Sequence, residues 1–88
     1  MNYYSVIFKN QKLELAFDDN IIEVVKLKNN LLYYLEYNIT CSDLNLYLIE
    51  NDTDILLNNN ENITPTNLYL LEIPNHTAIS GFSNVLDG

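Results

Sequence analysis

The chain is poor in the residues on which catalysis and covalent cross-links usually depend. Its 88 residues include one cysteine, one histidine, two glycines, two prolines and no tryptophan. A single cysteine cannot form a disulfide within the chain, and one histidine with one cysteine cannot complete a zinc site. Two glycines, Gly81 and Gly88, are too few for a glycine-rich phosphate loop. The fold must therefore rest on side-chain packing.

Nucleophilic catalysis needs a base that is oriented beside the nucleophile. Cys41 lies in a loop-like segment with Ser42 and Asp43, and His76 lies far along the chain in a polar segment after Pro74. Nothing in this pattern orients the imidazole toward the thiol. We therefore expect no enzymatic activity, no catalytic residue, no metal site and no cofactor.

Positively charged residues are also scarce. Long apolar runs are absent too, since none approaches the ~18 residues of a membrane-spanning helix. Four lysines face twelve acidic residues, which gives a formal net charge of −8 at pH 7. Such a charge repels nucleic-acid backbones and anionic membranes. We expect the partner to be another protein, with no direct nucleic-acid or membrane binding, in the cytoplasm or the nucleus.

Apolar and aromatic residues, in contrast, are abundant. Hydrophobic residues make up 48% of the chain, with seven tyrosines and three phenylalanines. This composition is typical of a folded chain, and the length suits one domain. We expect that domain at residues 1–74, followed by a tail at residues 75–88 that carries a few spaced apolar residues.

The first 17 residues predict a β-hairpin. Two alternating runs, "YSVIFK" and "KLELAF", flank Asn10-Gln11, which suits a two-residue turn. The pairs expected from this turn are Phe8 with Leu13, Val6 with Leu15, and Tyr4 with Phe17. One face of the hairpin is therefore apolar and Lys9 stands opposite Lys12.

Residues 20–36 predict an amphipathic helix. Asn20 with Glu23 resembles a capping box, and the following apolar residues share one side of a helical wheel. That side contains Ile21, Val24, Val25, Leu27, Leu31, Leu32 and Leu35. Lys28 falls on the same side, where a buried stem with its ammonium group led out to water is expected.

Two further alternating segments, residues 44–49 and 68–71, predict strands of the same sheet. If Leu44, Leu46, Leu48, Leu68 and Leu70 face the helix, then Tyr47, Ile49, Tyr69 and Leu71 face away from it. Residues 50–54 are expected to form a turn, and Ile63 to return to the core after a polar loop. The order of these elements predicts an α+β roll. Its expected core includes Phe8, Leu15, Val25, Leu46, Ile63 and Leu68.

Several short segments resemble ubiquitin. Ile22-Glu23-x-Val25-Lys26-x-Lys28 resembles the ubiquitin helix, and "LYL", a long polar loop, Ile63 and Leu68-x-Leu70 are similar to its later strands. The resemblance covers residues 3–73 and implies a β-grasp (ubiquitin-like) roll, with a mixed sheet packed on one main helix. It also implies that Lys26 is the shielded lysine and is paired with an acid of the 52–54 turn. The helical wheel instead favours Lys28 as the buried lysine.

The tight first hairpin and "LYLIENDTDILL" resemble elongin B, a ubiquitin-like adaptor subunit that is never conjugated. Conjugated modifiers end in Gly-Gly, but this chain ends in Asp87-Gly88. We therefore expect a non-conjugated adaptor or scaffold subunit. The alternatives are a small acidic inhibitor, such as a viral nucleic-acid mimic, and a ubiquitin-like covalent modifier.

The expected binding surface is the outward face of the sheet. The resemblance places Tyr47, Tyr69 and Leu71 at the isoleucine, histidine and valine of ubiquitin's recognition patch, and the strand alternation gives the same three residues. The predicted binding residues are Tyr47, Ile49, Tyr69, Leu71, Glu50 and Glu72. The two glutamates would form an acidic rim, so the expected partner presents an apolar groove with a basic rim.

Overall fold

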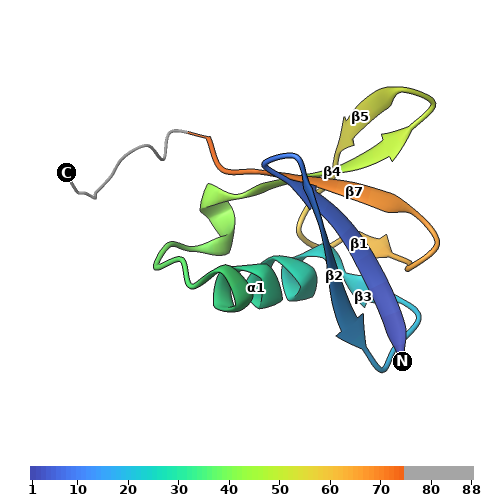
Figure 1. Cartoon of the computed structure of the whole chain (residues 1–88), viewed down its shortest axis with the longest axis horizontal. Helices are drawn as coiled ribbons and strands as arrows, with labels where there is room; N and C mark the ends of the chain where they lie inside the picture. Colours follow the sequence, from blue (N-terminus) through green and yellow to red (C-terminus); the bar gives the residue numbers. More distant parts are fainter. Residues whose placement is uncertain (75–88) are drawn as a thin grey trace.

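The computed structural model describes residues 1–74, which form a five-stranded sheet packed on one helix, with a small two-stranded sheet beside it (Figure 1). The main strands are β1 (Asn2–Phe8), β2 (Gln11–Phe17), β4 (Asn45–Glu50), β5 (Thr53–Leu56) and β7 (Leu68–Glu72). The helix is α1 (Val24–Leu35), and a 3-10 turn, η1 (Cys41–Asp43), follows it. Two short strands complete the set of elements: β3 (Ile22–Glu23) directly precedes α1, and β6 (Asn62–Ile63) lies between β5 and β7 in the chain.

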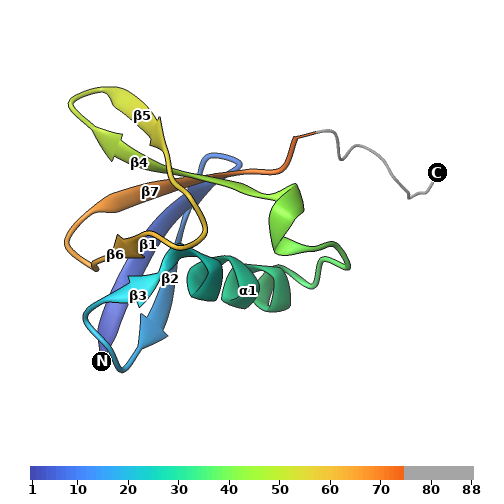
Figure 2. The same cartoon turned by 180° about the vertical axis from the view of Figure 1, so that it is seen from behind.

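The sheet is mixed, with the order β2-β1-β7-β4-β5. Strands β1 and β7 are parallel at its centre, while the other neighbours are antiparallel. Strands β3 and β6 form a separate two-stranded sheet beside the start of α1, as seen from behind in Figure 2. The predicted α+β roll with one main helix is confirmed.

The first hairpin forms, but its predicted turn and register are wrong. Its turn residues are Lys9 and Asn10, with φ of 52° and 63°, and the adjacent strand residues Phe8 and Gln11 pair. Left-handed φ at both central positions is the geometry of a tight hairpin turn, which asparagine tolerates well. Lys12 therefore lies opposite Ile7 and not opposite Lys9.

The register differs from the predicted one by two residues. A shift by two preserves the side on which each residue lies, because side chains alternate along a strand. Val6 pairs with Leu13, and Tyr4 pairs with Leu15. The apolar face of the hairpin consequently survives the error, and it faces α1 as expected.

The start of the helix differs from the prediction. Ile22 and Glu23 form β3, and α1 begins at Val24 with no side-chain cap. The loop before β6 replaces the cap: the N–H groups of Val24 and Val25 donate to the carbonyls of Glu61 and Asn59, both at 2.9 Å. Helix N-termini need such acceptors, and here they come from residues distant in sequence. Asn20 is therefore not the helix cap.

The hydrophobic core lies between α1 and the sheet. Its buried apolar residues are Tyr4, Val6, Phe8, Leu15, Phe17, Ile22, Val24, Leu27, Leu31, Leu32, Leu44, Leu46, Leu57, Ile63, Tyr69 and Leu71. Four of the six predicted core residues are among them, while Val25 and Leu68 are only partly buried. Ile21, expected on the buried side of the helix, is 53% exposed; it precedes α1, so the helical periodicity does not apply to it, and its neighbour Ile22 of β3 is buried instead.

Lys28 is the buried lysine, as the helical wheel favoured. It is 4% exposed, and its Nζ donates to the carbonyl of Leu44 at 2.9 Å and to Oδ1 of Asn59 at 2.6 Å. The stem of Lys28 is therefore buried, as expected, and its ammonium group bonds to these two protein acceptors. These two acceptors tie the middle of α1 to the segments before β4 and before β6.

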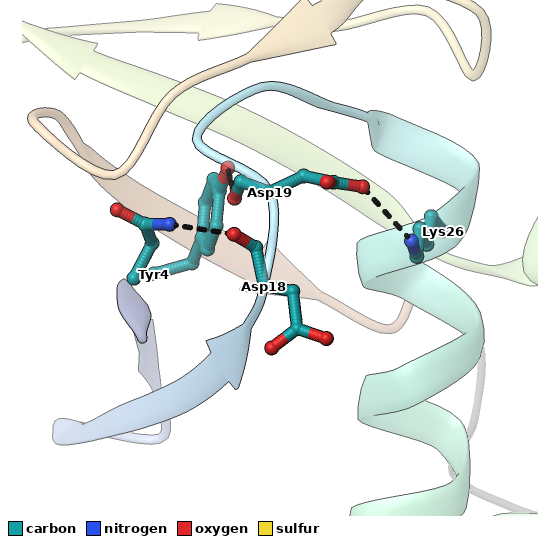
Figure 3. Close-up of polar contacts among 5 residues, drawn as sticks. Tyr4, Asp18, Asp19 and Lys26 are labelled. Carbon is teal, nitrogen blue, oxygen red and sulfur yellow. Dashed lines mark hydrogen bonds and ion pairs between the residues drawn. The ribbon is translucent and has the colours of Figure 1, made fainter.

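Lys26 is exposed and pairs with a different acid from the expected one. Its Nζ lies 3.8 Å from Oδ2 of Asp19, and the backbone carbonyl of Asp19 accepts the Tyr4 hydroxyl at 2.9 Å (Figure 3). The expected pairing of Lys26 with the 52–54 turn is wrong. The register implied by the ubiquitin resemblance therefore fails at this lysine.

The buried site of Lys28 predicts a pH dependence of stability. Burial lowers the pKa of Lys28 from the ordinary value of 10.5. Between the folded and the unfolded pKa, the unfolded chain binds more protons, so raising the pH through this interval increases the free energy of unfolding. We expect wild type to gain stability relative to Lys28→Met as the pH rises toward 10.5, measured by urea denaturation.

The control for this prediction is Lys26→Met, which removes an exposed lysine from the same helix. It should retain the pH slope of wild type because it retains Lys28. An equal slope in wild type and Lys28→Met would contradict the prediction.

Candidate protein-binding surface on the sheet

The two faces of the sheet differ in what covers them. One face packs on α1, and the other, which we call the outer face, has no element over it among residues 1–74 (Figures 1 and 2). Strand alternation assigns side chains to these faces. Tyr4, Val6 and Phe8 of β1 are buried in the core, so Ser5 and Ile7 lie on the outer face.

Apolar side chains from three strands meet on the outer face. Along one row, Ile7 of β1 pairs with Leu70 of β7, which pairs with Tyr47 of β4. In the neighbouring row, Leu68 pairs with Ile49. All five side chains are partly exposed. We call this set, Ile7, Tyr47, Ile49, Leu68 and Leu70, the outer sheet patch.

Tyr47 and Ile49 lie on the outer face, as predicted, but Tyr69 and Leu71 do not. Tyr69 is 1% exposed and Leu71 is 3% exposed, and both belong to the core. Leu71 pairs with Leu46, while Tyr69 pairs with Leu48 and with Val6. The predicted orientation of this strand is therefore inverted, and Leu68 and Leu70 take the outward positions.

The Tyr69 hydroxyl explains how a tyrosine is accommodated in this core. It donates to the backbone carbonyl of Thr64 at 2.7 Å and accepts the Thr64 N–H at 3.1 Å. A buried hydroxyl without partners would be costly, but here both bonds close the loop between β6 and β7. The sequence segment "LYLL" gave no indication of this, because apolar or aromatic residues occupy both sides of the strand.

Tyr47 is held in place by a small polar cluster. Oε1 of Glu72 accepts the Tyr47 hydroxyl at 2.7 Å and the Asn45 side-chain amide at 3.1 Å. These bonds from Asn45 and Tyr47 lower the pKa of Glu72, and the bond to Glu72 raises the pKa of Tyr47. At neutral pH the carboxylate is therefore charged, and it orients the tyrosine ring at the edge of the patch.

The acidic rim of the outer face differs in part from the expected one. Glu72 lies beside Tyr47, as predicted. Glu50, however, follows Ile49 and alternates with it, so it lies on the other side of the β4–β5 hairpin. The rim instead contains Glu14, opposite Ser5, and Asp54, opposite Ile49. Lys12, opposite Ile7, is the one basic residue of these outer rows.

Sequence reasoning missed Ile7, Leu68 and Leu70. Because neighbouring side chains of a strand point to opposite faces, the inward position of Val6 and Phe8 already predicts that Ile7 faces outward. Leu68 and Leu70 were missed with the inversion of β7.

The residues considered for catalysis do not form a site in the described part of the chain. Cys41 is partly buried, and its thiol donates to the side-chain carbonyl of Asn29. Within residues 1–74, no group of three or more His, Cys, Asp or Glu side chains could hold a metal ion, and no helix is long and apolar enough to cross a membrane. His76, Gly88 and the apolar residues of the tail lie outside the described residues.

Comparison with known proteins supports the fold. Neither a scan against protein-family models nor a search of curated proteins found a match. Among solved structures, the chain is similar to a computationally designed protein based on the template of human erythrocytic ubiquitin, determined by NMR in solution. The two share 19% identity with a TM-score of 0.62, over 91% of this chain and 100% of that one.

This chain has the ubiquitin-like β-grasp fold. The mixed sheet, its central parallel pair and the single main helix agree with that assignment. Identity at this level shows the fold and leaves the function to be argued from the surface of the molecule.

Proposed function

We propose that this chain is a non-enzymatic protein-interaction module, a ubiquitin-like adaptor or scaffold subunit that binds another protein through its outer sheet patch. The observation that carries the proposal is the contiguity of five apolar side chains across three strands of an uncovered sheet face. Grouped apolar residues on a surface are typical of interaction sites, and tyrosine is favoured at their energetic centres.

The surroundings of the patch indicate the chemistry of the partner. Glu14, Asp54 and Glu72 border it, and the chain carries a net charge of −8. A partner with an apolar groove and a rim of Lys or Arg complements this arrangement, and rim charges of this kind increase association rates more than affinity. Because Glu72 orients Tyr47, part of the surface is ordered before binding.

Mimicry of nucleic acid by an acidic inhibitor would require closely repeated carboxylates along one element. Helix α1 contains no acidic residue, and the acids of the described residues are spread over turns and strand edges. This distribution favours the adaptor over the acidic inhibitor.

Replacing Tyr47 and Leu70 together with alanine tests the proposal. We expect the loss of at least about 2 kcal/mol of binding free energy, which corresponds to about a 30-fold weaker complex. The measurement is quantitative capture of the partner from the source cells, followed by mass spectrometry and titration of the captured protein. Circular dichroism should show a retained fold, since both side chains lie outside the core.

The matched control is Tyr33→Ala with Tyr34→Ala. These helix residues are 87% and 60% exposed and lie outside the sheet. Capture should survive this change. Unchanged capture by the folded Tyr47/Leu70 variant, or loss of capture in the control, would move the binding surface elsewhere.

A further inference from the structure

A second feature, distinct from the outer sheet patch, is the free edge of β5. This strand is the last in the sheet order and, among the strands of residues 1–74, pairs only with β4. All four of its residues are exposed, including Ile55 at 41% and Leu56 at 56%. Within residues 1–74, its far edge has no strand beside it.

The hairpin geometry fixes which backbone groups face this edge. Asn51 and Asp52, with φ of 52° and 64°, form a two-residue turn, so the flanking pair Glu50 and Thr53 is hydrogen-bonded across the ladder. Just after β5, the Leu57 N–H donates to the carbonyl of Leu46 at 2.9 Å, so Leu57 faces β4 as Thr53 does four residues earlier. Residues between these bonded pairs direct their N–H and C=O groups outward.

The outward-directed residues are Asp54 and Leu56. They pair with Ile49 and Tyr47 without exchanging ladder bonds, so each offers one donor and one acceptor to an additional strand. A row of unsatisfied backbone groups of this kind is a template for strand addition.

The side chains of β5 protect this edge only through one charge, that of Asp54. Leu56 lies beside Tyr47 on the outer face, and Ile55 lies beside Leu48 on the opposite face. In both views the β4–β5 hairpin extends beyond α1, so the helix does not cover it (Figures 1 and 2). Natural sheets usually block an open edge with lysine, proline or a bulge, and the sequence Thr-Asp-Ile-Leu contains neither residue.

The negative charge of the β4–β5 hairpin favours one kind of added strand over another. Glu50, Asp52 and Asp54 lie on this hairpin, and residues 45–57 contain no Lys, Arg or His. A second copy of the chain would bring three more carboxylates and another net charge of −8 to the same edge. Repulsion between the carboxylates of two copies opposes the pairing of one β5 edge with another. A strand that carries Lys or Arg is attracted to the same carboxylates.

We propose that the free edge of β5 binds an extended segment of another protein, in which apolar residues alternate with Lys or Arg, as an added strand. Its backbone bonds to Asp54 and Leu56, its basic side chains lie with the Asp54 carboxylate on one face, and its apolar side chains lie with Ile55 on the other. The proposal does not depend on the proposed function, because the added strand bonds to the backbone of β5 and contacts none of the five patch residues, although Asp54 also borders the patch.

The probe is a blocked peptide of alternating valine and lysine, about eight residues long to match a typical strand. It is titrated into the full chain, and amide hydrogen exchange is followed by NMR. We expect exchange at Asp54 and Leu56 to slow by at least about tenfold, since each amide gains a hydrogen bond on binding. The matched peptide with glutamate in place of lysine should not bind.

Two variants at one position separate the backbone bond from the side-chain charge. Asp54→Ala removes the carboxylate and keeps the N–H, whereas Asp54→Pro removes both while leaving the ladder bonds to β4 intact, as proline permits at a strand edge. We expect Asp54→Pro to bind the lysine peptide about tenfold more weakly than Asp54→Ala, the value of one hydrogen bond. Continued protection of the Ile55 and Leu57 amides, which face β4, shows that the hairpin of the variant is intact.

Four results would overturn the proposal. Two concern the peptides: unchanged amide exchange at Asp54 and Leu56 with excess lysine peptide, or equal binding of the lysine and glutamate peptides. The other two are equal affinity of Asp54→Ala and Asp54→Pro for the lysine peptide, and protection of both amides before any peptide is added. The last result would mean that a second copy, or the chain itself, occupies the edge. If Asp54→Pro loses the hairpin, the exchange measurement on wild type decides the question.

Discussion

Replacing Tyr69 with alanine is expected to lower the free energy of unfolding by about 3–5 kcal/mol, the usual loss for a large aromatic residue removed from a core. The ring is 1% exposed between Val6 and Leu48, which it pairs with on either side. The variant also loses both hydrogen bonds to Thr64. Urea denaturation followed by circular dichroism measures the change.

Two controls separate the contributions to this loss. Tyr69→Phe keeps the ring but removes both hydrogen bonds to the partly buried Thr64 backbone, which at about 0.5–1.5 kcal/mol for each bond should cost about 1–3 kcal/mol. Leu70→Ala changes the next residue of the strand, which is partly exposed on the outer face, and should cost less than Tyr69→Ala. A larger loss for Leu70→Ala than for Tyr69→Ala would mean that β7 has the opposite orientation.

Replacing Leu46 with alanine should cost about 2–5 kcal/mol. This residue is fully buried on β4 opposite Leu71, close to the contact between the sheet and α1. Small domains have total stabilities of about 5–15 kcal/mol, so the loss removes a large part of the whole. For a domain of this size each kcal/mol lowers the melting temperature by roughly 4–8 °C.

Leu56→Ala is the matched control for Leu46→Ala, since the same substitution is made at a site that is 56% exposed. It should shift the melting temperature by only a few degrees, because surface changes are usually worth about 0.5 kcal/mol or less. Equal shifts for the two variants would contradict the assignment of β4 to the core.

Alternation and turn residues in the sequence predicted most of the architecture. The hairpin of β1 and β2, the helix and the later strands all follow from local patterns, and residues 50–54 contain the predicted second turn. The first turn was misplaced by one residue because Lys9-Asn10 and Asn10-Gln11 both offer an asparagine to a two-residue turn. The core face tolerated the error, since the resulting shift of two residues keeps every side chain on its side.

The candidate site was predicted less well, for a physical reason. Along residues 68–71, apolar or aromatic side chains occupy both sides of the strand, so periodicity cannot decide which side is buried. The decision depends on the pairing of Tyr69 with Val6 and on the bonds from its hydroxyl to Thr64, which are tertiary contacts. Transfer of positions from ubiquitin's patch repeated the same inversion.

Lys28 shows the opposite case, in which local periodicity was more reliable than the resemblance. The helical wheel placed Lys28 on the buried side, and the structure does the same. The wheel could not identify its acceptors, because Leu44 and Asn59 lie 16 and 31 residues away in sequence. The cap supplied to α1 by Asn59 and Glu61 was hidden for the same reason.

The most direct test of the outer sheet patch as a binding surface is photo-crosslinking from within it. A photoreactive benzoyl-phenylalanine replaces Tyr47 in one preparation and Tyr33, which is 87% exposed on α1, in another. Both are irradiated in source-cell extract with and without excess wild-type chain. We expect one protein to be crosslinked from position 47, to be removed by the competitor, and to be absent from position 33. Crosslinks that are the same from both positions, or a competed crosslink from position 33 alone, would contradict it.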